Sequence, residues 1–134
     1  MDWASKFGVR AALFVFSAIL GSIIFAADAG IAAPVFDFVR SFPLGDKIAH
    51  FILMGTLALL ANLVLSRGLL ARSRHSILIG TAVVAGIILL EEISQIWIPG
   101  RTFSFSDLTA DALGIACGSF SARAILRSTS SRAV

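Results

Sequence analysis

Four long apolar stretches, separated by short polar segments, dominate the pattern of the chain. They cover about 7–27, 48–65, 77–98 and 108–126. Each is close to the roughly 20 residues with which a helix crosses a bilayer at about 1.5 Å per residue. The segments between them are too short for a sizeable soluble domain. The pattern predicts an all-α fold, a single integral membrane four-helix bundle that takes up the whole chain, residues 1–134.

Local signals indicate where the predicted helices end. Pro99-Gly100 ends the third helix, and Ser106 or Asp107 can cap the fourth. Asp46 can cap the second. The serine-rich tail after Arg127 is predicted to be disordered.

The connection between the first two stretches, 28–45, has two interpretations. Its apolar residues recur at helical spacing opposite two charged ones, which favours a short helix lying on the membrane interface. An irregular apolar loop folded over the bundle fits the same pattern. The apolar positions are Val35, Phe36, Val39 and Phe42, and the charged ones are Asp37 and Arg40.

The first stretch also has two interpretations. Ala27-Asp28-Ala29 is an A-x-A sequence after a basic start, so the stretch could be a cleaved signal peptide. A membrane span is favoured, because the apolar run is longer than the roughly 7–15 residues of a signal peptide core.

Composition supports a membrane protein and argues against a soluble globular protein and a nucleic-acid-binding protein. The chain is 57% hydrophobic and 14% charged, with a mean hydropathy of +0.93, and a soluble fold could not bury so much apolar surface. The net charge of +3 could suggest nucleic acid, but the basic residues are scattered without stacking aromatics. Cys117 is the single cysteine, which excludes an internal disulfide and a thiolate metal cluster.

The basic residues indicate the orientation. Eight lie on one side of the four predicted spans and three on the other, which predicts that both termini are cytoplasmic. Seven of the eight acidic residues lie toward the opposite, outer side. The three outer basic residues are Arg40, Lys47 and Arg101.

Three of the predicted helices bring polar residues to the outer membrane level. They form three pairs, Asp46 with His50, Glu92 with Gln95 and Asp107 with Asp111. The members of each pair are three or four residues apart and share a helical face. An unpaired charge at this depth costs several kcal/mol, so the pairs must face the bundle interior, a partner or water. The predicted ligand-binding residues are Asp46, Lys47, His50, Glu92, Gln95, Arg101, Asp107 and Asp111.

A purely structural role is the alternative for this group. Asp46 and Asp107 could be caps, His50 an interhelical hydrogen-bonding residue and Arg101 a surface counter-ion. Glu92 is the deepest member and is not at a cap position, so we expect it to pair with His50 or Arg101. We predict one connected site, because intramembrane ionisable residues are usually functional.

Small residues line one face of the fourth predicted helix. Ala110, Gly114 and Gly118 form a stripe that contains G-x-x-x-G, which lets another helix approach closely. Packing inside the bundle is the first interpretation, and a homodimer is the second.

The ordered motifs resemble the VanZ-like family of bacterial membrane proteins. They are D-K-x-x-H at 46–50, E-x-x-Q at 92–95, P-G-R at 99–101 and then Asp107 and Gly114, and the resemblance covers about 46–118. The family usually has Asn where this chain has Asp111. It is named for a protein that confers low-level teicoplanin resistance. The resemblance implies a multi-pass protein of the bacterial cytoplasmic membrane.

Functions of three classes are compatible with these residues. A binding or shielding module, ranked first, would hold the polar headgroup of an envelope lipid, a lipid-linked sugar or a glycopeptide antibiotic. A membrane-embedded enzyme on a lipid-linked envelope substrate is second, and a small transporter is third, because no charge lies near the bilayer centre. Membrane lipids are the expected partners. The catalytic candidates are Glu92, His50 and Asp107, and a divalent metal in the enzyme would have His50, Glu92, Asp107 and Asp111 as candidate ligands.

Overall fold

The computed structural model describes residues 3–31, 33–67, 75–99 and 103–131. Every regular element in these ranges is helical, as predicted. The elements in chain order are α1 (Trp3–Asp28), α2 (Ala33–Arg40), α3 (Gly45–Arg67), α4 (Ser76–Ser94) with a 3-10 turn η1 (Gln95–Trp97), and α5 (Phe105–Ser131). The four predicted long helices are thus confirmed.

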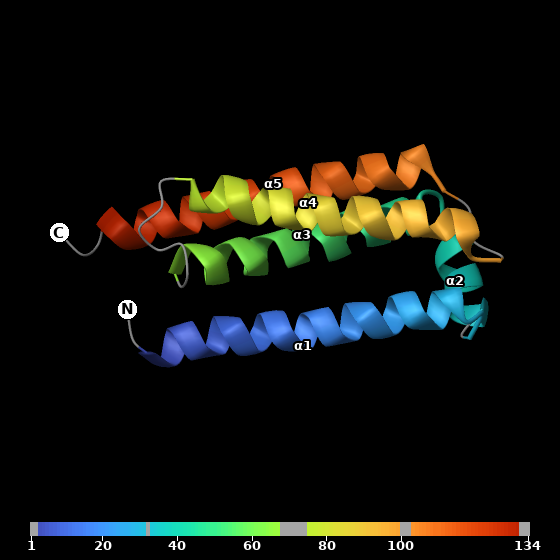
Figure 1. Cartoon of the computed structure of the whole chain (residues 1–134), viewed down its shortest axis with the longest axis horizontal. Helices are drawn as coiled ribbons and strands as arrows, with labels where there is room; N and C mark the ends of the chain where they lie inside the picture. Colours follow the sequence, from blue (N-terminus) through green and yellow to red (C-terminus); the bar gives the residue numbers. More distant parts are fainter. Residues whose placement is uncertain (1–2, 32, 68–74, 100–102, 132–134) are drawn as a thin grey trace.

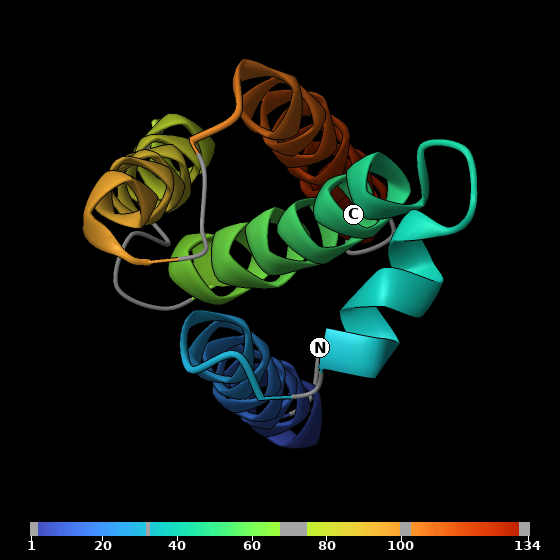
Figure 2. The ribbon, with the colours of Figure 1, turned by 90° about the vertical axis from the view of Figure 1, so that its right-hand side faces the viewer.

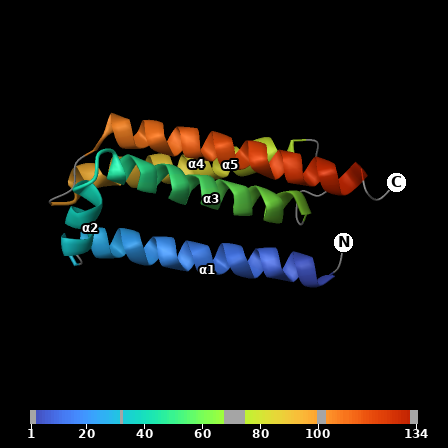
Figure 3. The same ribbon diagram turned by 180° about the vertical axis from the view of Figure 1, so that it is seen from behind.

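The long helices run alongside one another, with α3 in the centre (Figure 1 and, from behind, Figure 3). The end view shows α4 and α5 on one side of α3 and α1 on the other (Figure 2). Helix α3 packs most extensively against α5. Among the described helices, α1 packs extensively only against α3. Helix α2 crosses one end of the bundle, which we call the α2 end, and both termini lie at the opposite end (Figure 1).

Among the described residues, three helices are long and apolar enough to cross a membrane: Phe7–Asp28, Gly45–Ser66 and Ile79–Trp97. They correspond to the first three predicted spans. Helix α5 is longer, at 27 residues, but it is not among the three. Its apolar residues are diluted by Asp111, Arg123 and several Gly and Ser residues. The three candidate spans indicate a multi-pass protein by length and hydropathy, and the fourth crossing stays a prediction.

The contact between α3 and α5 depends on glycine. A Cβ atom on Gly118 would overlap the carbonyl oxygen of Gly55, and one on Gly114 would overlap that of Phe51. Helix α5 can bring its backbone this close to α3 because Gly114 and Gly118 have no side chain, which is how small residues hold membrane helices together. Gly114 and Gly118 therefore pack inside the bundle, which was the first interpretation of their spacing. A second copy could not use the same face while α3 occupies it.

The connection between α1 and α3 contains the predicted short helix, α2. The regular helix over Ala33–Arg40 decides against the loop interpretation, although none of its residues is buried. The turn into α3 uses Leu44 in a left-handed conformation (φ 59°). Gly45 follows, where any Cβ would overlap the carbonyl oxygen of Val39. This tight turn holds α2 against the first turn of α3.

The tail after Arg127 is not disordered up to Ser131, contrary to the prediction from its serines. Helix α5 continues through these residues. The hydroxyls of Ser128 and Thr129 donate to the carbonyl oxygen of Ile125, at 2.9 and 2.8 Å. Such bonds satisfy the hydroxyls within the helix, so the serines do not end it.

A buried polar cluster joins α3, α4 and α5 in the middle of the bundle. The Asn62 amide nitrogen donates to the hydroxyls of Ser119 (3.1 Å) and Thr81 (3.3 Å), which are 2.8 Å apart. Asn62 is fully buried. Interhelical bonds of this kind contribute about 0.6–2 kcal/mol in membranes. The sequence analysis missed the cluster, although Asn62 is the only asparagine in the chain and interrupts an apolar run.

Candidate functional site

A lysine joins two of the predicted acidic residues at the α2 end. The Lys47 ammonium group donates to Asp46 Oδ2 at 2.8 Å and also to Asp107 Oδ1. Asp46 and Lys47 lie in the first turn of α3, and Asp107 lies in the first turn of α5. Because Lys47 reaches across from α3 to α5, the two helix starts are held together by charge-assisted bonds.

A histidine–carboxylate pair lies one turn further in. The His50 Nδ1 atom is 2.9 Å from Asp111 Oδ1. The Asp111 side chain is only 2% exposed, and the His50 side chain is 28% exposed. With Nδ1 donating to the buried carboxylate, Nε2 is the ring nitrogen left to meet a ligand. Asp111, whose role the sequence left open, therefore orients His50.

Glu92 is the most deeply buried acidic residue of the group. It is fully buried, and its Oε1 accepts the backbone N–H of Ser104 at 2.7 Å. Its Oε2 accepts the amide of Gln95 at 3.2 Å, and the same amide also donates to Glu91. Glu92 does not face lipid. Of the two partners expected for Glu92, His50 is bonded to Asp111 instead, and Arg101 lies outside the described residues.

Ser104 caps α5, which corrects the expectation that Ser106 or Asp107 would do so. The Ser104 hydroxyl accepts the backbone N–H of Asp107 at 3.3 Å. Glu92 takes the N–H of Ser104 itself, the bond that a residue at the Asp107 position makes in a capping box. Asp107 is thereby free for Lys47. The spacing S-x-x-D at 104–107 is the sequence signal that could have revealed this cap.

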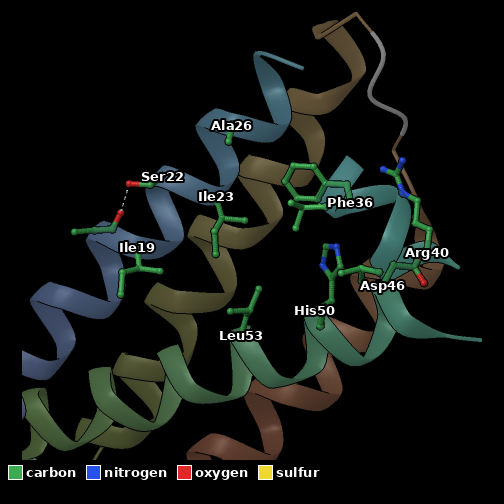
Figure 4. Close-up of a pocket in the computed structure, with 13 residues that line it drawn as sticks. Ile19, Ser22, Ile23, Ala26, Phe36, Arg40, Asp46, His50 and Leu53 are labelled. Atoms are coloured by element: carbon green, nitrogen blue, oxygen red, sulfur yellow. Dashed lines mark hydrogen bonds between the residues drawn. The ribbon is translucent and has the colours of Figure 1, made fainter. Parts of the chain in front are cut away.

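A cavity of about 650 Å³ adjoins this group between α1, α2 and α3, and we call it the α1–α3 cavity. Figure 4 shows that Arg40, Asp46 and His50 gather at one end of it, beside Phe36. Its wall toward the middle of the bundle is mainly apolar. The lining residues are Ala18, Ile19, Ser22, Ile23, Ala26, Val35, Phe36, Val39, Arg40, Asp46, Ala49, His50 and Leu53. The sequence analysis did not foresee this cavity or the place of Arg40 in it.

The predicted residues thus form three hydrogen-bonded groups at one end of the bundle. Two of them, around Lys47 and around Glu92, are joined through Ser104. The third is His50 with Asp111. Arg101 lies outside the described residues. Within the described ranges, no three His, Cys, Asp or Glu side chains are grouped so as to hold a metal ion.

Comparison with known families bears on the identity of this arrangement. The family model VanZ/LLP1 matches residues 6–127. The chain belongs to the VanZ/LLP1 family. The match covers nearly all of α1 to α5, so VanZ/LLP1 membership extends beyond the motif region at 46–118. This VanZ/LLP1 protein is a multi-pass membrane protein by the length and hydropathy of its helices. Neither the curated proteins nor the solved structures include a match to the chain.

Proposed function

We propose that this VanZ/LLP1 protein binds the polar headgroup of an envelope amphiphile at the α2 end of its bundle, on the outer side of the bacterial cytoplasmic membrane. Lipids, lipid-linked sugars and glycopeptide antibiotics of the teicoplanin type all present such groups. The outer orientation is supported by the eight-to-three distribution of Lys and Arg. It is also compatible with both termini lying at the end opposite α2 (Figure 1).

One observation carries the proposal. His50 is fixed from behind by the buried carboxylate of Asp111 and borders a cavity large enough for a ligand. Pockets that bind small molecules measure about 300–1,000 Å³ and combine apolar walls with a few converging polar groups. A residue needed only to join helices would have no reason to border such a cavity.

Replacing His50 by alanine is expected to remove the lipid or glycolipid that the full chain retains in mild detergent. The substitution deletes the ring nitrogen facing the cavity and leaves Asp111 unpaired. The measurement is mass spectrometry of the extracted amphiphiles. His75→Ala is the matched control, since His75 lies at the start of α4, at the opposite end of the bundle, and does not line the cavity. Equal retention by His50→Ala and the wild type would contradict the proposal.

A membrane-embedded enzyme is the second candidate, and the His50–Asp111 pair favours it. A histidine oriented by a buried carboxylate is the arrangement of a general base. In this case the ligand would be chemically changed rather than only held.

The substitution Asp111→Asn separates the two candidates. The amide oxygen can still accept from His50 Nδ1, so we expect binding to stay near the wild-type level. If His50 is a general base, it would lose the carboxylate that orients it and stabilises its protonated form. In a serine protease the same change lowers turnover by roughly 10⁴. Mass spectrometry of the bound amphiphile before and after incubation measures both quantities. Chemical change by the wild type that Asp111→Asn abolishes would identify an enzyme.

A further inference from the structure

The apolar part of the α1–α3 cavity lies between two of the helices that can cross a membrane. Ile19 and Ile23 of α1 face Leu53 of α3 across it (Figure 4). Water would find few hydrogen-bond partners on these walls. A hydrocarbon chain needs no hydrogen-bond partners there, and it fits in a space of about 650 Å³. The walls therefore favour the apolar chain of a lipid as the occupant.

The polar end of the cavity has the charge that a phosphate requires. Arg40 is held by Asp37 only at 3.9 Å, and its side chain is 62% exposed. Its guanidinium group can therefore offer the paired donors that suit phosphate oxygens. Asp46, which also borders the cavity, bonds to Lys47, which also bonds to Asp107. Among the described residues at this end, Arg40 is therefore the cation that remains for the phosphate. Asp46 and His50 remain as partners for hydroxyl groups.

We propose that the α1–α3 cavity holds one acyl chain of a glycerophospholipid from the surrounding leaflet, with the lipid phosphate on Arg40. The headgroup hydroxyls then lie toward Asp46 and His50. This inference rests on the proposed function, because it names the ligand class of the same site. It adds the apolar half of the site and the residue that recognises the phosphate.

The phosphate contact is tested by offering the full chain two lipids with the same acyl chains. Phosphatidylglycerol carries the phosphate, and diacylglycerol lacks it. Native mass spectrometry of the protein in detergent is expected to show a preference for phosphatidylglycerol. Arg40→Gln is expected to weaken its binding roughly tenfold or more and to remove the preference, since a charge-assisted bond is lost. A preference that survives Arg40→Gln would overturn the phosphate assignment.

The position of the acyl chain is tested by filling the cavity. Ile23→Trp places a large ring in it, and Ala26→Leu fills it with a smaller group if the first variant does not fold. Both are expected to lose bound phosphatidylglycerol while keeping a cooperative melting transition. Ile87→Trp is the matched control, because Ile87 is exposed on α4 and does not line the cavity.

The outcomes distinguish this inference from the proposed function. Wild-type retention of phosphatidylglycerol by a folded cavity-filled variant would overturn the position of the acyl chain. The proposed function would still stand if His50→Ala lost the lipid. Loss in Ile23→Trp together with wild-type retention in His50→Ala would support the apolar site and contradict the headgroup proposal.

Discussion

Replacing Gly118 by leucine is expected to lower the free energy of unfolding by about 3 kcal/mol or more, because the new side chain must push two helix backbones apart. The atom it would meet is the carbonyl oxygen of Gly55, which cannot turn away as a flexible side chain would. Helices in a bilayer gain nothing from leaving lipid, so close packing is a main source of their association. Separating α3 from α5 would also separate Lys47 from Asp107.

Gly86→Leu is the matched control for this prediction. Gly86 lies within α4, and a Cβ there meets no atom within 4 Å. A leucine side chain at position 86 therefore extends into open space without a clash. Thermal unfolding in detergent measures both variants. Equal melting temperatures for Gly118→Leu and the wild type would show that the contact between α3 and α5 is not as close as the structure has it.

The sequence predicted the helices well because their signals are local. Length and hydropathy define each long stretch, and spacing indicated α2, as one of two interpretations, and the stripe with Gly114 and Gly118. The serines after Arg127 were misjudged because a hydroxyl that returns to Ile125 looks, in sequence, like one that favours a loop. Helix α5 shows the limit of composition, because Asp111 and Ser119 are buried against other helices and still reduce its hydropathy.

The sequence predicted which residues lie at the site but not which of them bond to one another. Periodicity showed that Asp46, His50, Glu92 and Asp107 reach one level, and the structure brings them to the same end of the bundle. Which carboxylate meets His50 depends on how each helix is rotated about its axis, which no local pattern reports. The α1–α3 cavity was equally out of reach. It arises because α1 contacts α3 while α2 crosses the end of the bundle.

Removing the carboxylate of Glu92 altogether, as in Glu92→Leu, is expected to destabilise the start of α5 by about 3 kcal/mol. The change leaves the Ser104 N–H without its acceptor and removes one acceptor of the Gln95 amide. An orphaned buried donor costs roughly 1–3 kcal/mol. Glu91→Leu is the matched control, because Glu91 is adjacent and accepts from the same Gln95 amide, whereas the Ser104 N–H donates to Glu92. Hydrogen exchange of the amides at 104–108 should increase in Glu92→Leu and not in Glu91→Leu.

Glu92→Gln then separates the structural role from a catalytic one. The amide keeps its oxygen for the Ser104 N–H, but its NH2 group cannot accept from the Gln95 amide, so stability should fall less than in Glu92→Leu. If Glu92 acts by holding Ser104, and through it Asp107 beside Lys47, lipid retention should stay within roughly tenfold of the wild type, about 1.4 kcal/mol. A folded Glu92→Gln protein that had lost all turnover would instead assign Glu92 to proton transfer. The distinction rests on geometry, because Glu92 is fully buried behind its bonds to Ser104 and Gln95, so a ligand would reach its carboxylate only if these groups moved.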